Sequence, residues 1–141
     1  MSQQALASWN PHKKEKKAIQ RRSQLEGFIR VDQMWDWLKI NFGDVLAVDS
    51  PHSFHPESFT YKELANNISK AAKCFSQIGI ESGDVVAIFS ENSPRWLIAD
   101  QGLMRLGASD AVRGATAPAN ELRYILEDSN SVGLIVQNSD V

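Results

Sequence analysis

The first regular pattern of apolar and polar positions begins at residue 31. Its apolar side chains are three or four residues apart, at Val31, Met34, Trp35, Leu38 and Phe42. This spacing places them on one face of a helix, which we expect to end at Gly43. The apolar run 45–48 predicts a strand, and the two prolines and two histidines between Ser50 and Ser58 predict a loop.

The sequence predicts its best-defined helix directly after Thr60. Thr60 stands three residues before Glu63, so each side chain can bond the backbone N–H of the other residue in a capping box. Gly79 supplies the expected stop. The apolar stripe between these ends is Tyr61, Leu64, Ala65, Ile68, Ala72, Phe75 and Ile78. Cys74 lies in the same helix and, as the single cysteine, is expected to be an inert side chain with no disulfide.

From residue 85 onward, strands and helices alternate. The predicted order is a buried strand at 85–89, a helix from Ser93–Pro94 to Gly107, a weaker strand at 108–112, a helix from Pro118 to Ser129 and a buried strand at 132–136. This alternation predicts an α/β fold in which a mostly parallel sheet carries helices on its faces. Trp96 is expected to be mostly buried, because its helix is apolar nearly all round. A sheet that stops soon after a strand would leave an unprotected edge, so we expect the chain to be a fragment.

Charge divides the chain into two parts. Residues 1–30 contain seven Lys or Arg and two Glu, whereas the whole chain of 141 residues has a net charge of -2. We therefore expect a basic, flexible N-terminal arm at 1–30 and an incomplete globular domain at 31–141. The arm is a solvated leader, or a docking segment for anionic lipid or an acidic protein. A third alternative, a transit peptide, is disfavoured by Glu15, Glu26 and the shortage of Ser. No apolar run reaches the roughly 18 residues of a membrane-spanning helix, and no signal core follows Met1, which indicates a soluble, intracellular protein.

Few residues suggest chemistry, and none of them predicts a catalytic, cofactor-binding or metal-binding role. The sequence contains neither G-x-G-x-x-G nor G-x-x-x-x-G-K-[ST], the usual phosphate-binding loops. His52 and His55 share a loop with Asp49 and Glu57, but no third set of ligands has a recognisable spacing, which favours an exposed loop over a metal site. The tryptophans do not alternate with the basic residues, which argues against nucleic-acid binding.

Arg113 is the single candidate for a surface or ligand-facing role. It precedes Gly114 and stands at the carboxyl end of the predicted strand 108–112, where ligands approach open parallel sheets. The alternative is a structural ion pair with a nearby acid such as Asp110.

Several runs resemble, in order and spacing, the start of the adenylate-forming superfamily, which includes acyl-CoA synthetases, luciferases and the adenylation domains of peptide synthetases. They are residues 59–64 (FTYKEL), 79–88 (GIESGDVVAI) and 91–96 (ENSPRW). Residues 34–52, 96–102 (WLIADQG) and 111–114 (AVRG) are similar to the cyanobacterial and plastid long-chain branch, whose members activate free fatty acids for acyl carrier protein. Most of the superfamily has a proline-containing segment where Arg113 and Gly114 stand here.

The resemblance implies the first portion of the large N-terminal domain of a fatty-acid ligase. Such an enzyme uses ATP and Mg²⁺ to form an acyl-adenylate from a long-chain fatty acid, and then transfers the acyl group to CoA or acyl carrier protein. The loop ending in Pro-Lys-Gly, the Tyr-Gly-x-Thr-Glu segment and the lysine of the mobile C-terminal domain do not occur in residues 1–141. The resemblance therefore assigns no catalytic residue to this chain, which we expect to be inactive alone.

Two functional hypotheses follow. In the first, the chain is part of a cytoplasmic ligase that contacts the membrane peripherally through its arm. In the second, the chain is a freestanding, non-catalytic interaction module whose arm docks to membrane or to a carrier protein.

The basic arm predicts salt-sensitive binding to anionic membranes. Each basic residue close to an anionic surface contributes on the order of 1 kcal/mol, and screening shortens the range of this attraction from about 10 Å at 0.1 M salt to about 3 Å at 1 M. We expect the chain to sediment with anionic but not with neutral vesicles, and residues 31–141 alone to remain in solution. Equal sedimentation of both proteins, or binding indifferent to salt, would leave the arm a solvated leader.

Overall fold

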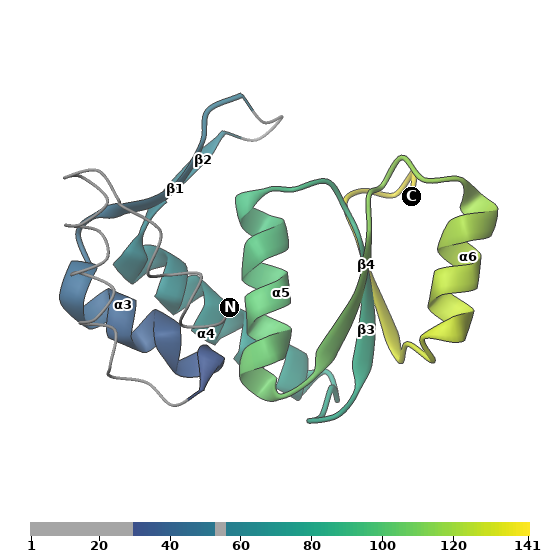
Figure 1. Cartoon of the computed structure of the whole chain (residues 1–141), viewed down its shortest axis with the longest axis horizontal. Helices are drawn as coiled ribbons and strands as arrows, with labels where there is room; N and C mark the ends of the chain where they lie inside the picture. The colour runs from purple at the N-terminus through teal and green to yellow at the C-terminus, as the bar shows by residue number, and fades with distance from the viewer. Residues whose placement is uncertain (1–29, 53–55) are drawn as a thin grey trace, which may run out of the picture.

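The computed structural model describes residues 30–52 and 56–141. The elements are η1 (Val31–Gln33, a 3-10 helix), α3 (Met34–Phe42), β1 (Leu46–Ser50), β2 (Glu57–Thr60), α4 (Tyr61–Gln77), β3 (Val85–Phe89), α5 (Pro94–Leu106), β4 (Ser109–Arg113), α6 (Ala119–Asp128) and β5 (Gly133–Val136). In Figure 1, α3 and α4 lie on one side of α5, and the sheet that contains β3 and β4 lies between α5 and α6.

Three strands form one parallel sheet in the order β4-β3-β5. Val85 of β3 is paired with Ser109 of β4, and the pairing continues without a register shift to Phe89 and Arg113. β5 is paired in parallel with the other side of β3. The predicted α/β fold, with these three strands parallel, is confirmed.

The central strand β3 is buried on both faces, as its continuous apolar run predicts. On one face the buried cluster is Val86, Ile88, Leu103 and Ala108; on the other it is Ala87, Phe89 and Leu122. Leu103 belongs to α5 and Leu122 to α6, so the two helices cover opposite faces of the same strand. Full burial of a Val, Ile or Phe side chain contributes about 1.5 to 3 kcal/mol, so this strand is a main source of stability.

Helix α5 packs against a second layer as well as against the sheet. Leu97 and Ile98 contact a cluster centred on Leu64 and Ile68 of α4, and Trp35 of α3 completes it. Leu64, Ile68 and Trp35 are buried, with exposed fractions of 1%, 0% and 8%. Because α5 is buried on two sides, it joins the sheet to the α3–α4 layer.

A glycine allows α4 and α5 to approach closely. A Cβ atom at Gly102 of α5 would lie 2.9 Å from the Ala71 Cβ and 3.2 Å from the Phe75 Cε2 of α4. Carbon atoms in contact prefer separations of about 3.5 to 4.0 Å, so any larger residue at this position would push the helices apart.

The predicted helix ends are confirmed. Thr60 Oγ1 accepts a hydrogen bond from Glu63 N at 3.3 Å, and Glu63 Oε2 accepts one from Thr60 N at 2.9 Å, which completes the capping box of α4. Ser93 Oγ accepts a hydrogen bond from Trp96 N at 3.0 Å at the start of α5. Both stop glycines have the left-handed backbone that glycine favours, with φ of 94° at Gly79 and 88° at Gly107.

The predicted loop between Ser50 and Ser58 is wrong at its C-terminal end. Glu57–Thr60 form β2, which pairs with β1 in an antiparallel hairpin. Phe59 packs against the α4 cluster, so burial of this ring and the backbone bonds to β1 hold the strand. Four residues with one large apolar side chain are too few to show the alternation that identifies a strand.

The predicted strand 132–136 is buried on one face, but the prediction that its other face is also buried is wrong. Ile135 of β5 packs in the cluster below α5. Leu134 and Val136, which point to the other face, remain 46% and 38% exposed. Among the described residues, α6 contacts β3 and β4 but does not cover β5.

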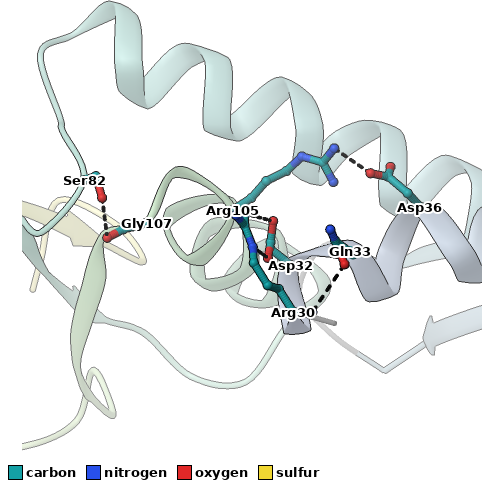
Figure 2. Close-up of polar contacts among 7 residues, drawn as sticks. All are labelled: Arg30, Asp32, Gln33, Asp36, Ser82, Arg105 and Gly107. Atoms are coloured by element: carbon teal, nitrogen blue, oxygen red, sulfur yellow. Dashed lines mark hydrogen bonds and ion pairs between the residues drawn. The ribbon is translucent and has the colours of Figure 1, made fainter. Parts of the chain in front are cut away.

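One ion pair connects α3 to α5, and a second lies within the first described residues (Figure 2). Arg105 Nη2 lies 2.8 Å from Asp36 Oδ2, and Arg30 Nη2 lies 2.6 Å from Asp32 Oδ2. The hydrogen bond from Arg30 lowers the pKa of Asp32. Arg30 N also donates to Gln33 Oε1 at 3.3 Å. Such pairs near the surface are each worth about 1 kcal/mol or less, so they position α3 rather than stabilise the fold.

The rest of the basic arm, residues 1–29, lies outside the described residues, and so does His55. Among the helices that are described, none combines the length and the apolar character needed to cross a membrane. Cys74 is exposed on α4.

Close packing at Gly102 predicts a large effect of a single substitution. Gly102→Val should lower the free energy of unfolding by about 1 to 3 kcal/mol, because the added methyl groups must displace Ala71 and Phe75. Urea denaturation would measure the change. Gly133→Ala is the matched control, since a Cβ at Gly133 meets its nearest neighbours at an ordinary 3.8 Å. Equal stability of Gly102→Val and the parent chain would contradict the close helix approach.

Candidate functional site

The carboxyl ends of β3 and β4 border a hollow of about 330 Å³. We call it the sheet-end hollow. Its lining residues are Ser90, Glu91, Asn92, Trp96, Val112, Arg113 and Gly114. A second hollow of about 420 Å³, the β1 hollow, shares Asn92 and Trp96 with it. The β1 hollow is further lined by Val48, Asp49, Ser50, Ser93, Pro94 and Leu97.

Trp96 stands between these two hollows. It packs against the cluster of Val86 and Leu103 below α5 and is not among the exposed apolar side chains, so the predicted burial of most of the ring is confirmed. Trp96 stands in the first turn of α5, where part of the ring also lines both hollows. An aromatic ring with one open side is suited to apolar or stacking contacts with a bound group.

Arg113, the last residue of β4, lies at the sheet-end hollow. Its Nε donates to Glu121 Oε1 of α6 at 2.6 Å, and both side chains are about half exposed, at 48% and 39%. The predicted alternative, an ion pair of Arg113, is thus present, but its partner is not Asp110. Residues three apart on a strand point to opposite faces, so Asp110 faces α5 while Arg113 faces α6.

Glu91 is fixed beside this pair. Its backbone N–H donates to Gln137 Oε1 at 2.9 Å, and its Oε1 accepts a hydrogen bond from Thr116 Oγ1 at 3.4 Å. A Cβ on Gly114 would lie 3.2 Å from Glu91 Oε1, so glycine leaves room for the carboxylate. The Glu121 bond, with a contribution from the Glu91 charge, raises the pKa of Arg113 above its ordinary value.

Sequence reasoning identified Arg113 but not its acidic neighbours. Glu91 follows β3 and Arg113 is the last residue of β4, so the rule that carboxyl ends of parallel strands meet at one edge could have found Glu91. No comparable signal marks Glu121, because its position on α6 depends on how that helix crosses the sheet.

These groups do not form a phosphate or metal site. One arginine faces two carboxylates, Glu91 and Glu121, so the local charge does not favour a triphosphate. No group of three or more His, Cys, Asp or Glu that could hold a metal ion occurs in residues 30–52 and 56–141. The residues that the structure describes therefore do not by themselves supply a complete site for Mg²⁺ and ATP. The arrangement can bind a neighbouring segment or small group by apolar contact and hydrogen bonds.

The sequence comparisons agree with one another. A family model described as "AMP-binding enzyme" matches residues 40–141. "Probable acyl-activating enzyme 16, chloroplastic" from Arabidopsis thaliana is 36% identical over 110 residues, which are 78% of this chain and 15% of that protein. "Long-chain-fatty-acid--[acyl-carrier-protein] ligase AEE15, chloroplastic", also from Arabidopsis thaliana, is 34% identical with the same coverage of both chains. This chain thus spans a small part of the length of either relative.

Solved structures show the same architecture. The N-terminal subdomain of NpsA from Klebsiella oxytoca superposes with a TM-score of 0.69 at 28% sequence identity. The match covers 77% of this chain and 28% of the solved chain. The described fold is therefore similar to part of an N-terminal subdomain.

The Arg113–Glu121 pair predicts a small effect on stability. Exposed pairs of this kind contribute about 0.2 to 1 kcal/mol. Arg113→Gln should therefore change the free energy of unfolding by less than about 1 kcal/mol. Chemical denaturation of Arg113→Gln, Glu121→Gln and the double variant would measure the coupling. A loss of several kcal/mol would show that the pair is a structural anchor rather than a part of an open surface.

Proposed function

This chain belongs to the family of AMP-binding enzymes, and we propose that it forms the first part of the N-terminal domain of a ligase that activates long-chain fatty acids. The observation that carries the proposal is the 110-residue similarity to a plant long-chain-fatty-acid–[acyl-carrier-protein] ligase. The runs at 59–64, 79–88 and 91–96 occur in the order expected of such enzymes.

The proposed reaction of the whole ligase has two steps. The fatty-acid carboxylate attacks the α-phosphorus of ATP, an acyl-phosphate bond forms and pyrophosphate leaves. A thiol then attacks the acyl carbon, a thioester forms and AMP leaves with the bonding electron pair. The thiol belongs to acyl carrier protein or to CoA; the name of the Arabidopsis thaliana relative favours acyl carrier protein. ATP and Mg²⁺ are the cofactors we propose for the longer protein.

Within that ligase, the described residues act as a scaffold. Three arginines of the described residues are paired with carboxylates: Arg95 with Glu57, Arg105 with Asp36 and Arg113 with Glu121. A site that stabilises the charge developing during adenylate formation needs cations aimed at phosphate oxygens. We propose that such groups come from other parts of the ligase and that this chain supports them through the β3 sheet.

The scaffold role predicts that residues 1–141 alone do not catalyse fatty-acid-dependent ATP–pyrophosphate exchange. We expect no exchange above background with palmitate, because positioned cations account for most of the catalysis in such transfers. The assay follows labelled pyrophosphate entering ATP, with and without fatty acid. Exchange that depends on fatty acid would contradict the scaffold role.

The gene sequence downstream of Val141 distinguishes the proposed ligase from the second hypothesis, a freestanding interaction module. A reading frame that continues past Val141 into a loop ending in Pro-Lys-Gly supports the ligase, and the longer protein should then form acyl-adenylate. A stop codon directly after Val141 would favour the interaction module. Acyl transfer by the longer protein should be measured with CoA and with acyl carrier protein in parallel, which also identifies the acceptor.

A further inference from the structure

Two carboxyl groups meet between α5 and β4, away from the sheet-end hollow. Asp110 of β4 is paired in register with Val86 of β3. Val86 packs in the cluster under α5, and paired residues of parallel strands point to the same face, so Asp110 also points toward α5. There it is close enough to the Asp100 carboxyl of α5 for Asp100 to raise the pKa of Asp110.

The Asp110 carboxyl is poorly solvated. Asp110 Oδ2 is buried from solvent and receives no hydrogen bond from a donor of the described residues. A buried oxygen without a donor is costly when it is charged, and a second carboxylate next to it raises the cost further. Two carboxyl groups in contact can share a hydrogen bond only if one of them is protonated.

The Asp100 carboxyl is held in place by a chain of hydrogen bonds. Gln101 Nε2 donates to Asp100 Oδ2 at 2.5 Å. The Oε1 atom of the same amide accepts a hydrogen bond from Trp35 Nε1 at 2.7 Å. Trp35 is buried in the α3–α4 layer, so the carboxyl cannot move far from Asp110 without breaking this chain.

The interactions that set the pKa of Asp110 include no cation. Strand β3, with Val85–Phe89, has no ionisable side chain. On α5, Arg95 is paired with Glu57 and Arg105 with Asp36. On β4 itself, Arg113 is paired with Glu121 on the opposite face. The charged residues of α6 belong to the helix that covers this opposite face.

We infer that Asp100 and Asp110 hold one proton between them and form a pH-sensitive contact that joins α5 to the edge strand β4. While the proton is present, the two carboxyls attract each other through a hydrogen bond. When it is lost, two negative charges face each other in a poorly hydrated place, and the contact weakens.

The direction of the pH effect follows from the protonation of Asp110. Burial and the Asp100 hydrogen bond raise the pKa of Asp110 from the ordinary 3.8 to about 6. Between these pH values the folded chain binds more protons than the unfolded chain. Stability conferred by this group is therefore complete below pH 3.8 and is lost as the pH rises through about 6.

Asp110→Asn tests the inference. The Asn amide can donate permanently to the Asp100 carboxylate, so this variant should not lose stability between pH 5 and pH 7.5 through this contact. At the upper end of that range its Tm should exceed that of the parent chain by roughly 2 to 6 °C. Asp44→Asn is the matched control, because Asp44 is exposed, and it should follow the parent.

A direct measurement covers the case in which a variant does not fold. The side-chain carboxyl carbon of Asp110, followed by NMR in the unaltered full chain, should titrate with a midpoint near 6. In Asp100→Asn the midpoint should fall toward the ordinary range, because the like charge is gone. Titration of Asp110 near 3.8 in the unaltered chain, or the same pH-dependent loss of Tm in Asp110→Asn as in the parent, would overturn the inference.

Discussion

The burial of β3 on both faces is the constraint on which the rest of the fold depends. A strand without a polar face must be shielded from solvent on both faces. Helix α5 packs on one face of β3, and α6 packs on the other. Its backbone also needs partners on both edges, which β4 and β5 supply in parallel. Parallel neighbours require crossovers, so the helices between the strands follow from the same requirement.

Helix α5 packs against both the sheet and the first half of the chain, and so links the two. Its sheet-facing side is fixed by β3, and its other side carries Leu97 and Ile98 toward α4. The small residues Gly102 and Ala71 set the distance between the two helices. In turn, α4 holds the β1–β2 hairpin through Phe59. The hairpin and α3 therefore depend on α5 rather than on direct contact with the sheet.

The sequence was informative where a single local signal determines the structure. The Thr60–Glu63 capping box, the Ser93 cap and the stop at Gly107 each depend on residues a few positions apart, and all three are present. It was less informative where a long-range partner decides. Strand β2 exists because β1 lies beside it, and the exposure of Leu134 depends on where α6 crosses the sheet. At the candidate site, Arg113 could be predicted from its strand, whereas its partner Glu121 comes from another element.

The charges of the described residues suit a scaffold rather than the chemistry that we propose for the longer protein. At the carboxyl edge of the sheet, the charge of Arg113 is offset by Glu121 and Glu91, so this edge offers no surplus cation. On the other face of the sheet, the Asp110 carboxyl lies next to the Asp100 carboxyl, and no cation contributes to its pKa. Both sites involve β4, which among the described residues is paired with β3 alone. An edge strand held by fewer backbone bonds than β3 responds more readily to a change in side-chain charge. A change in protonation at Asp110 would therefore alter the local stability of β4 first. Asp110 lies three residues before Arg113, which lines the sheet-end hollow.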